Sequence, residues 1–110
     1  MEKTINSILN GIREKIKSDA PISPLEWIDN AAELNVLVED LDNALLDARQ
    51  KVAHLKCELL EGGESVAAAE VRVEATDEFK EYLRLRAKRE MVIEYVRICK
   101  VRAKLDTWNV

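Results

Sequence analysis

The feature that most constrains this chain is a run of apolar residues whose spacing alternates between four and three for nearly five heptads. The run reads Trp27, Ala31, Leu34, Val38, Leu41, Leu45, Ala48, Val52, Leu55 and Leu59. Such a repeat predicts a helix that supercoils against a partner helix, because its apolar side chains return to one face every seven residues. We expect this helix over residues 24–61. Ser23 and Pro24 suit the N-cap and the first helical position, and Gly62 and Gly63 suit a helix end.

A second repeat of the same kind follows the glycines and predicts another helix over residues 65–106. It reads Ala68, Val71, Ala75, Glu78, Tyr82, Leu85, Arg89, Val92, Val96, Cys99 and Ala103. A short connection makes consecutive helices antiparallel neighbours, which places Trp27 opposite Cys99. Two polar residues, Glu78 and Arg89, interrupt the repeat. One interpretation is that they set the register of the paired helices; the other is that the repeat drifts and both side chains reach solvent.

A shorter helix is predicted over residues 2–17, where isoleucine and leucine recur at spacings of three and four. The chain is therefore predicted to be a single all-α domain over residues 1–110. Its architecture would be a short N-terminal amphipathic helix followed by a long antiparallel two-helix coiled-coil hairpin, assembled into a helical bundle. Only three glycines and two prolines occur, too few for the many turns of a β-sandwich or barrel.

Charged residues are unevenly distributed over the two long helices. Residues 19–61 carry ten acidic and three basic side chains, whereas residues 79–105 carry nine basic and three acidic ones. One interpretation is that opposite charges pair across the antiparallel helices. The alternative is that the basic segment binds nucleic acid. The residues assigned to that alternative are Arg84, Arg86, Arg97, Lys100, Arg102 and Lys104.

The C-terminal part of the chain has more apolar residues than one seam can bury. Residues 91–101 contain eight, which predicts a second apolar face that contacts the first helix, a second copy of the chain, or both. We therefore expect a homo-oligomer, most simply a dimer. The residues predicted for an oligomer or partner interface are Trp27, Met91, Ile93, Tyr95, Ile98, Val101, Leu105 and Trp108.

Motifs of catalysis or cofactor binding are not recognisable in the sequence. His54 and Cys57 lie three residues apart, but two ligands fall short of a zinc site. The glycine pair lacks the Gly-Lys-Ser/Thr of a phosphate-binding loop. We therefore predict a protein that is not an enzyme and holds neither metal nor cofactor.

Location is predicted from three further features. The apolar runs are too short to span a membrane, and the N-terminal residues lack the apolar block of a signal peptide. Two cysteines make no disulfide framework, which fits a reducing compartment. We expect a cytoplasmic protein.

Several features follow one another along residues 24–106: lysines at 51 and 56, a small loop at 61–65, an Ala/Glu-rich restart and an aliphatic final helix. In this order they resemble small helical-hairpin accessory proteins of tailed bacteriophages and prophages. The resemblance implies a coiled-coil protein-interaction module that acts in replication, recombination or host takeover, within the host cytoplasm; it carries over no functional residue. The alternatives are a nucleic-acid-binding protein and a structural subunit of a virion or secretion assembly.

Overall fold

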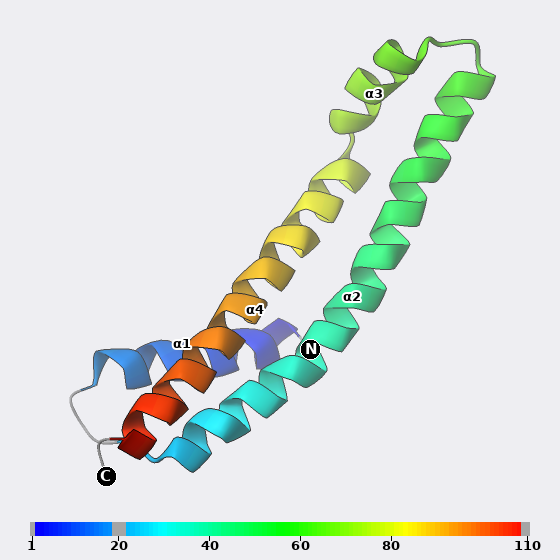
Figure 1. Cartoon of the computed structure of the whole chain (residues 1–110). Helices are drawn as coiled ribbons and strands as arrows, with labels where there is room; N and C mark the ends of the chain where they lie inside the picture. The colour runs from blue at the N-terminus through cyan, green and yellow to red at the C-terminus, as the bar shows by residue number, and fades with distance from the viewer. Residues whose placement is uncertain (1, 19–21, 109–110) are drawn as a thin grey trace. The chain divides into compact units, whose positions relative to one another are not determined.

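The computed structural model describes residues 2–18 and 22–108, with side chains for 5–18 and 22–105, and these residues are helical almost throughout (Figure 1). The elements are α1 (Glu2–Lys17), α2 (Pro24–Glu61), α3 (Val66–Glu74) and α4 (Asp77–Trp108). The all-α class is confirmed, and α1 and α2 have the predicted bounds. In the described ranges, no helix combines the length and the hydropathy needed to cross a membrane.

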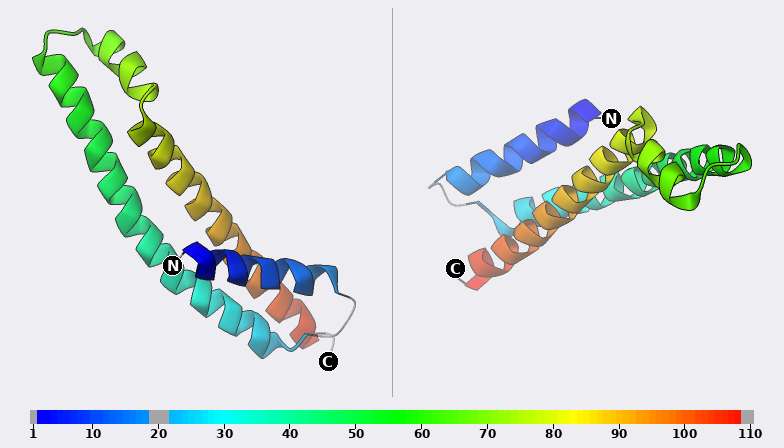
Figure 2. Two further views of the ribbon diagram at one scale, coloured as in Figure 1. Left: turned by 180° about the vertical axis from the view of Figure 1, so that it is seen from behind. Right: turned by 90° about the horizontal axis from the view of Figure 1, so that it is seen from above.

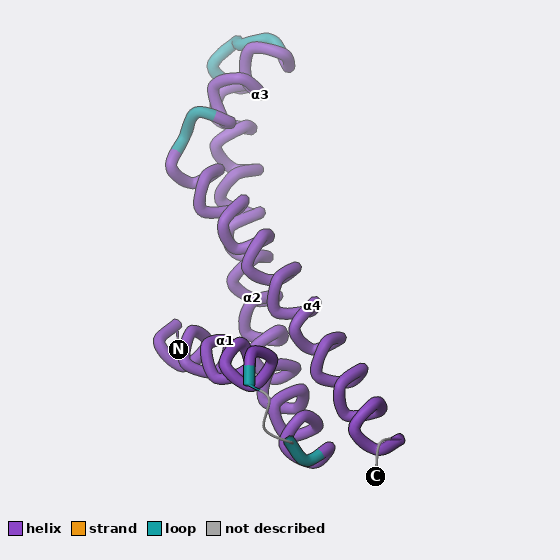
Figure 3. The backbone as a smooth tube through the Cα atoms, turned by 90° about the vertical axis from the view of Figure 1, so that its left-hand side faces the viewer, coloured by secondary structure: helices purple, strands orange, loops and turns teal. Residues whose placement is uncertain are grey.

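The prediction of one continuous helix over residues 65–106 is wrong, because the chain breaks between α3 and α4 (Figure 3). The break is at Thr76, whose Oγ1 donates to the carbonyl of Val73 at 2.6 Å and accepts from the amide of Phe79 at 3.2 Å. Thr76 is thus the N-cap of α4, and two acidic residues follow it, which stabilises a helix N-terminus. Thr76 followed by Asp77 and Glu78 is a helix-start signal in the sequence, but it lies inside the apolar repeat, which by itself predicts one continuous helix.

The break changes which residues face inward. Ala69 and Val73 of α3 are buried, whereas the predicted seam residue Val71 is exposed. After the break, Phe79 is half-buried and the adjacent Glu78 is exposed. At this point the inward-facing position is therefore one residue later than predicted, at Phe79 instead of Glu78.

The predicted seam is wrong at Ala68 and Ala75 as well, since both are exposed, but it is confirmed along α2 and along the later part of α4. All ten seam residues of α2 are buried or half-buried. In α4, Val92, Val96, Cys99 and Ala103 are buried. The heptad pattern therefore locates the inner face of both long helices away from the break.

The loop after α2 has a specific geometry that explains its two glycines. The amide of Glu64 donates to the carbonyl of Leu59 at 3.2 Å, and the amide of Gly63 donates to the carbonyl of Leu60 at 3.1 Å. This is the hydrogen-bond pattern of a Schellman helix end. Gly63 has a φ of 95°, a left-handed conformation that glycine adopts without a Cβ penalty.

Two compact units divide the chain. We call the first the three-helix unit; it comprises residues 1–40 and 90–110. In it, α2 and α4 run antiparallel, and α1 lies on one side of the pair with its Ile5, Leu9 and Ile12 buried (Figure 2). The hairpin unit comprises residues 41–89, in which α2 runs antiparallel to α3 and the start of α4. The prediction of one domain stays a prediction, since α2 and α4 contribute to both units.

Candidate interaction surfaces

The side of the three-helix unit that α1 covers is held by polar as well as apolar contacts. Arg13 Nε donates to the Tyr95 hydroxyl at 2.7 Å, and its guanidinium lies 5.6 Å from the centre of the same ring. Its Nη2 lies 4.0 Å from the Met91 sulfur. Lys15 Nζ lies 3.9 Å from a carboxylate oxygen of Glu26 on α2. The contact between the Arg13 cation and the Tyr95 ring adds an attraction to the burial of the apolar side chains of α1. Since Tyr95 belongs to α4 and Glu26 to α2, α1 docks on both long helices.

The residues predicted for an oligomer interface differ in how far they are exposed to solvent. Trp27 is buried within its own chain. The residues that lie beside α1 and are half-buried are Met91, Tyr95 and Ile98. The residues left exposed are Ile93, Val101 and Leu105. The side chain of Trp108 lies outside the described residues. Four of the eight predicted residues are therefore covered, at least in part, by the chain itself.

The six basic residues assigned to nucleic-acid binding are all exposed. Arg84 and Arg97 pair with carboxylates on their own helix. Arg84 Nη1 lies 3.4 Å from Glu81, and Arg97 forms an ion pair with Glu94. The hydrogen bond from Arg97 holds the pKa of the Glu94 carboxyl below its usual range. These ion pairs partly neutralise the positive charge of α4, but the side chains of Arg84 and Arg97 remain in solvent.

The cations at the end of α4 are less engaged. Lys100, Arg102 and Lys104 are exposed, and the structure's described residues form no ion pair with them. Arg102 also lines, with Arg97 and apolar residues of α1 and α4, a groove of about 310 Å³. No described acidic residue of α2 therefore forms an ion pair with these three cations.

Among the described residues of the hairpin unit, Arg89 with Asp42 and Lys56 with Glu70 show the predicted pairing of opposite charges across antiparallel helices. Arg89 Nε bonds a carboxylate oxygen of Asp42 across α4 and α2. Lys56 Nζ lies 3.2 Å from Glu70 across α2 and α3. The Arg89 side chain is half-buried, as a residue at the edge of a seam should be. The role of Arg89 in setting the register stays a prediction, as does that of Glu78, whose side chain is exposed.

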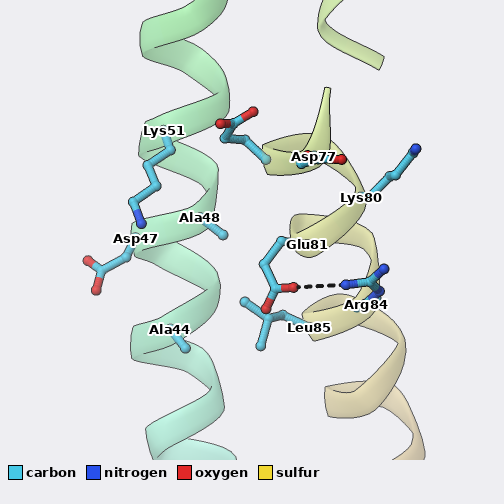
Figure 4. A pocket seen from close by; sticks show the side chains of 10 residues that line it. Ala44, Asp47, Ala48, Lys51, Asp77, Lys80, Glu81, Arg84 and Leu85 are labelled. Atoms are coloured by element: carbon cyan, nitrogen blue, oxygen red, sulfur yellow. Dashed lines mark hydrogen bonds and ion pairs between the residues drawn. The ribbon is translucent and has the colours of Figure 1, made fainter. Parts of the chain in front are cut away.

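A groove of about 700 Å³ opens between α2 and α4 in the hairpin unit (Figure 4). Ala44 and Ala48 leave the space because their side chains are short, and Leu85 faces them from α4. The charged residues around the groove are Asp47, Lys51, Asp77, Glu78, Lys80, Glu81 and Arg84. All seven are exposed, so the groove offers solvated charges of both signs rather than the desolvated acid or base of a catalytic site.

The histidine and the cysteines have ordinary surroundings for helix residues. His54 Nε2 lies 2.9 Å from Glu58 Oε1, and both side chains are exposed. Burial raises the pKa of the Cys99 thiol, and the nearby Lys15 opposes this effect. Cys57 is exposed. Over the described ranges, no three His, Cys, Asp or Glu residues come together as a group that could hold a metal ion.

The surface that sequence analysis missed is a second apolar stripe on α2. Leu25, Ile28 and Val36 are 65%, 54% and 63% exposed, and Ala32 between them is also exposed. At roughly 100° per residue, these four residues lie on the side of α2 opposite to the buried seam. We call them the outer stripe. Their spacing of three and four is present in the sequence, but the longer heptad repeat of the same helix is interleaved with it and dominates the pattern.

Comparisons with protein-family models, curated proteins and solved structures find no match for this chain. Its function is therefore argued from its own surfaces.

Proposed function

We propose that this protein is a non-enzymatic helical interaction module that binds other protein surfaces through its three-helix unit. The outer stripe of α2 is the observation that carries the proposal. The core is supplied by the opposite face of the same helix, and the large side chains of the stripe keep 54–65% of their surface in solvent. Contiguous apolar side chains in solvent characterise association surfaces, and an amphipathic helix offers them at spacings of three and four to a partner helix.

The charges around the stripe favour a protein partner over a nucleic acid. Residues 24–40 contain five acidic side chains and neither lysine nor arginine. Phosphate groups would be repelled from this helix face, whereas a basic or apolar partner helix would be accepted.

Nucleic-acid binding is the second candidate, and one specific observation favours it. The cations at positions 100, 102 and 104 of α4 are exposed and engage no described carboxylate. A short labelled oligonucleotide would test it: binding that falls steeply between low and moderate salt, and that is abolished by Lys100→Glu with Lys104→Glu, would support phosphate contacts.

The resemblance to phage accessory proteins suggests a setting for either candidate. A role in replication, recombination or host takeover, and the alternative of a subunit in a virion or secretion assembly, stay predictions. A partner protein identified by the experiment below would distinguish among them.

Site-specific photo-crosslinking tests the proposed function. A benzophenone amino acid replaces Val36 in the outer stripe, and a matched variant carries it at the exposed Gln50 of the same helix. After irradiation of the cells that encode the protein, we expect protein adducts of discrete mass from position 36 but not from position 50. An absence of adducts at position 36, or the same adducts at both positions, would refute a protein-binding role for this face.

A further inference from the structure

A groove of about 310 Å³ lies between α1 and α4 within the three-helix unit. Its apolar lining consists of Ile16 from α1 and of Ile98 and Val101 from α4, and Arg97 and Arg102 complete the lining. Ile16 and Ile98 are half-buried, and Val101 is 45% exposed. We call this feature the α1–α4 groove. Because solvent reaches its apolar side chains, a binding partner can reach them as well.

The apolar lining of the groove continues along α4. Leu105 follows Val101 by four residues and is 51% exposed, so Ile98, Val101 and Leu105 recur at spacings of three and four. Residues at these spacings share one side of a helix, and the buried residues Cys99 and Ala103 lie on a different side of α4. We call the three apolar residues the α4 strip. A strip with this spacing matches the apolar face of a second helix.

Cations border the α4 strip on both sides. At roughly 100° per residue, Arg97 and Lys104 lie on one side of the strip and Arg102 lies on the other. Residues 95–105 contain four basic side chains and no acidic one. Arg97 is paired with Glu94, whereas neither Arg102 nor Lys104 forms an ion pair with a described residue. The strip therefore matches an apolar surface that is bordered by carboxylates, which a guanidinium binds through two parallel hydrogen bonds.

The shape and the chemistry of the groove favour a protein helix among the anionic partners. Single-stranded nucleic acids stack their bases on aromatic side chains, and the groove is lined by aliphatic residues and arginines instead. A bilayer presents a broad surface, whereas this site is a groove between two helices. A partner helix can insert a leucine or isoleucine side chain between α1 and α4, while its flanking carboxylates reach Arg102 and Lys104.

We propose that the α1–α4 groove and the α4 strip bind an acidic amphipathic helix of a partner protein. Apolar side chains of the partner fill the groove and cover the strip, and its acidic side chains pair with Arg102 and Lys104. The inference goes beyond the proposed function, because it assigns a second binding surface and does not depend on the outer stripe. Since the groove is small, we expect an isolated helix to bind with a dissociation constant on the order of 10–100 μM.

Titration of the isotope-labelled full chain with a synthetic helix, followed by nuclear magnetic resonance, tests the inference. The probe peptide carries leucine at spacings of three and four and glutamate at the flanking positions. The control peptide carries lysine in place of every glutamate. We expect the acidic peptide to shift the amide signals of Ile16, Ile98 and Val101 in a saturable way. The basic peptide should leave these signals unchanged, because the cations of residues 95–105 repel it.

Two variants separate the apolar part of the site from the charged part. Val101→Ser removes an exposed apolar side chain from the groove, and Arg102→Glu reverses a bordering charge. Each should raise the dissociation constant of the acidic peptide by about fivefold or more. The matched controls are Ile93→Ser, at a position that is 40% exposed on the same helix, and Arg84→Glu, at an exposed arginine of the hairpin unit. Both controls should bind the peptide like the wild type.

The inference is overturned by the absence of a saturable shift at the groove up to about 1 mM peptide, by equal binding of both peptides, or by binding that either variant leaves unchanged. Parallel titrations use a single-stranded oligonucleotide and vesicles of phosphatidylglycerol. Binding of one of these without binding of the acidic peptide would also overturn the inference and would assign the cations to phosphate. The proposed function is tested separately by crosslinking at position 36, so the two proposals can fail independently.

Discussion

Two leucines of α2, Leu34 and Leu46, give a test of burial in which the chemistry of the substitution is held constant. Leu34 is 0% exposed in the seam of the three-helix unit, whereas Leu46 is 54% exposed. Both positions lie inside one helix, so replacement by alanine changes helix propensity equally. The difference between the two variants therefore reports side-chain burial alone.

The magnitude follows from the atoms removed. Leu34→Ala deletes three buried carbon groups, each worth about 0.8 kcal/mol of transfer free energy. The cavity that remains adds a further cost, which brings the expected loss of unfolding free energy to about 3–5 kcal/mol. Leu46 keeps more than half of its surface in water, so Leu46→Ala should cost less than about 1 kcal/mol. Against a total stability of roughly 5–15 kcal/mol for a chain of this size, only the first loss is severe.

Urea unfolding followed by circular dichroism at 222 nm measures both values. The variants should keep the slope of the wild-type transition, since they expose the same surface on unfolding, and differ in midpoint. Similar losses at the two positions, or a loss below about 1 kcal/mol for Leu34→Ala, would mean that α2 does not pack along the heptad face.

Three other predictions follow from local contacts. Thr76→Ala should lower the unfolding free energy by about 1 kcal/mol in urea titrations because α4 loses its N-cap, and Thr76→Ser should retain it; equal losses would contradict the cap. Cys99 should react with a thiol reagent only on unfolding, whereas Cys57 should react at once, as single-cysteine variants would show. Because burial raises the pKa of the Cys99 thiol in the folded state, its contribution to stability should be lost as the pH rises above about 8.5, and pH-independent stability over that range would refute this. Replacing Asp42 by Asn should lower the free energy of unfolding by up to about 1 kcal/mol at low salt and by less at 1 M salt, because the ion pair with Arg89 is half-exposed. An equal decrease at both salt concentrations would mean that the pair makes no electrostatic contribution to stability.

The helices that sequence could locate are those whose signals are local. The bounds of α2 follow from Ser23, whose Oγ accepts from the amide of Glu26 at 3.3 Å, and from the left-handed Gly63. The seam between them follows from the heptad spacing. These features require only the chain's own neighbours along the helix, so they were predictable.

The candidate surfaces could be predicted only in part. The apolar excess at residues 91–101 was recognised, but not that α1 would cover Met91, Tyr95 and Ile98 and leave Ile93 exposed. The outer stripe was not recognised at all. A periodic pattern states which residues share a side of a helix, but it does not state which of two apolar sides another segment will cover.

The sequence by itself therefore determined the all-α class, the start and end of α2, and the inward face of most of both long helices, because backbone periodicity fixes side-chain directions about each helix axis. The helix start at Thr76 rests on local contacts as well, with Val73 and Phe79, but it lies inside the second apolar repeat. Only the tertiary structure decided that α1 would dock on one side of the α2–α4 pair, because that outcome depends on contacts between segments that are distant in the sequence, such as Arg13 with Tyr95. The same contacts decide which apolar and charged residues stay in solvent, and therefore which face is available to a partner.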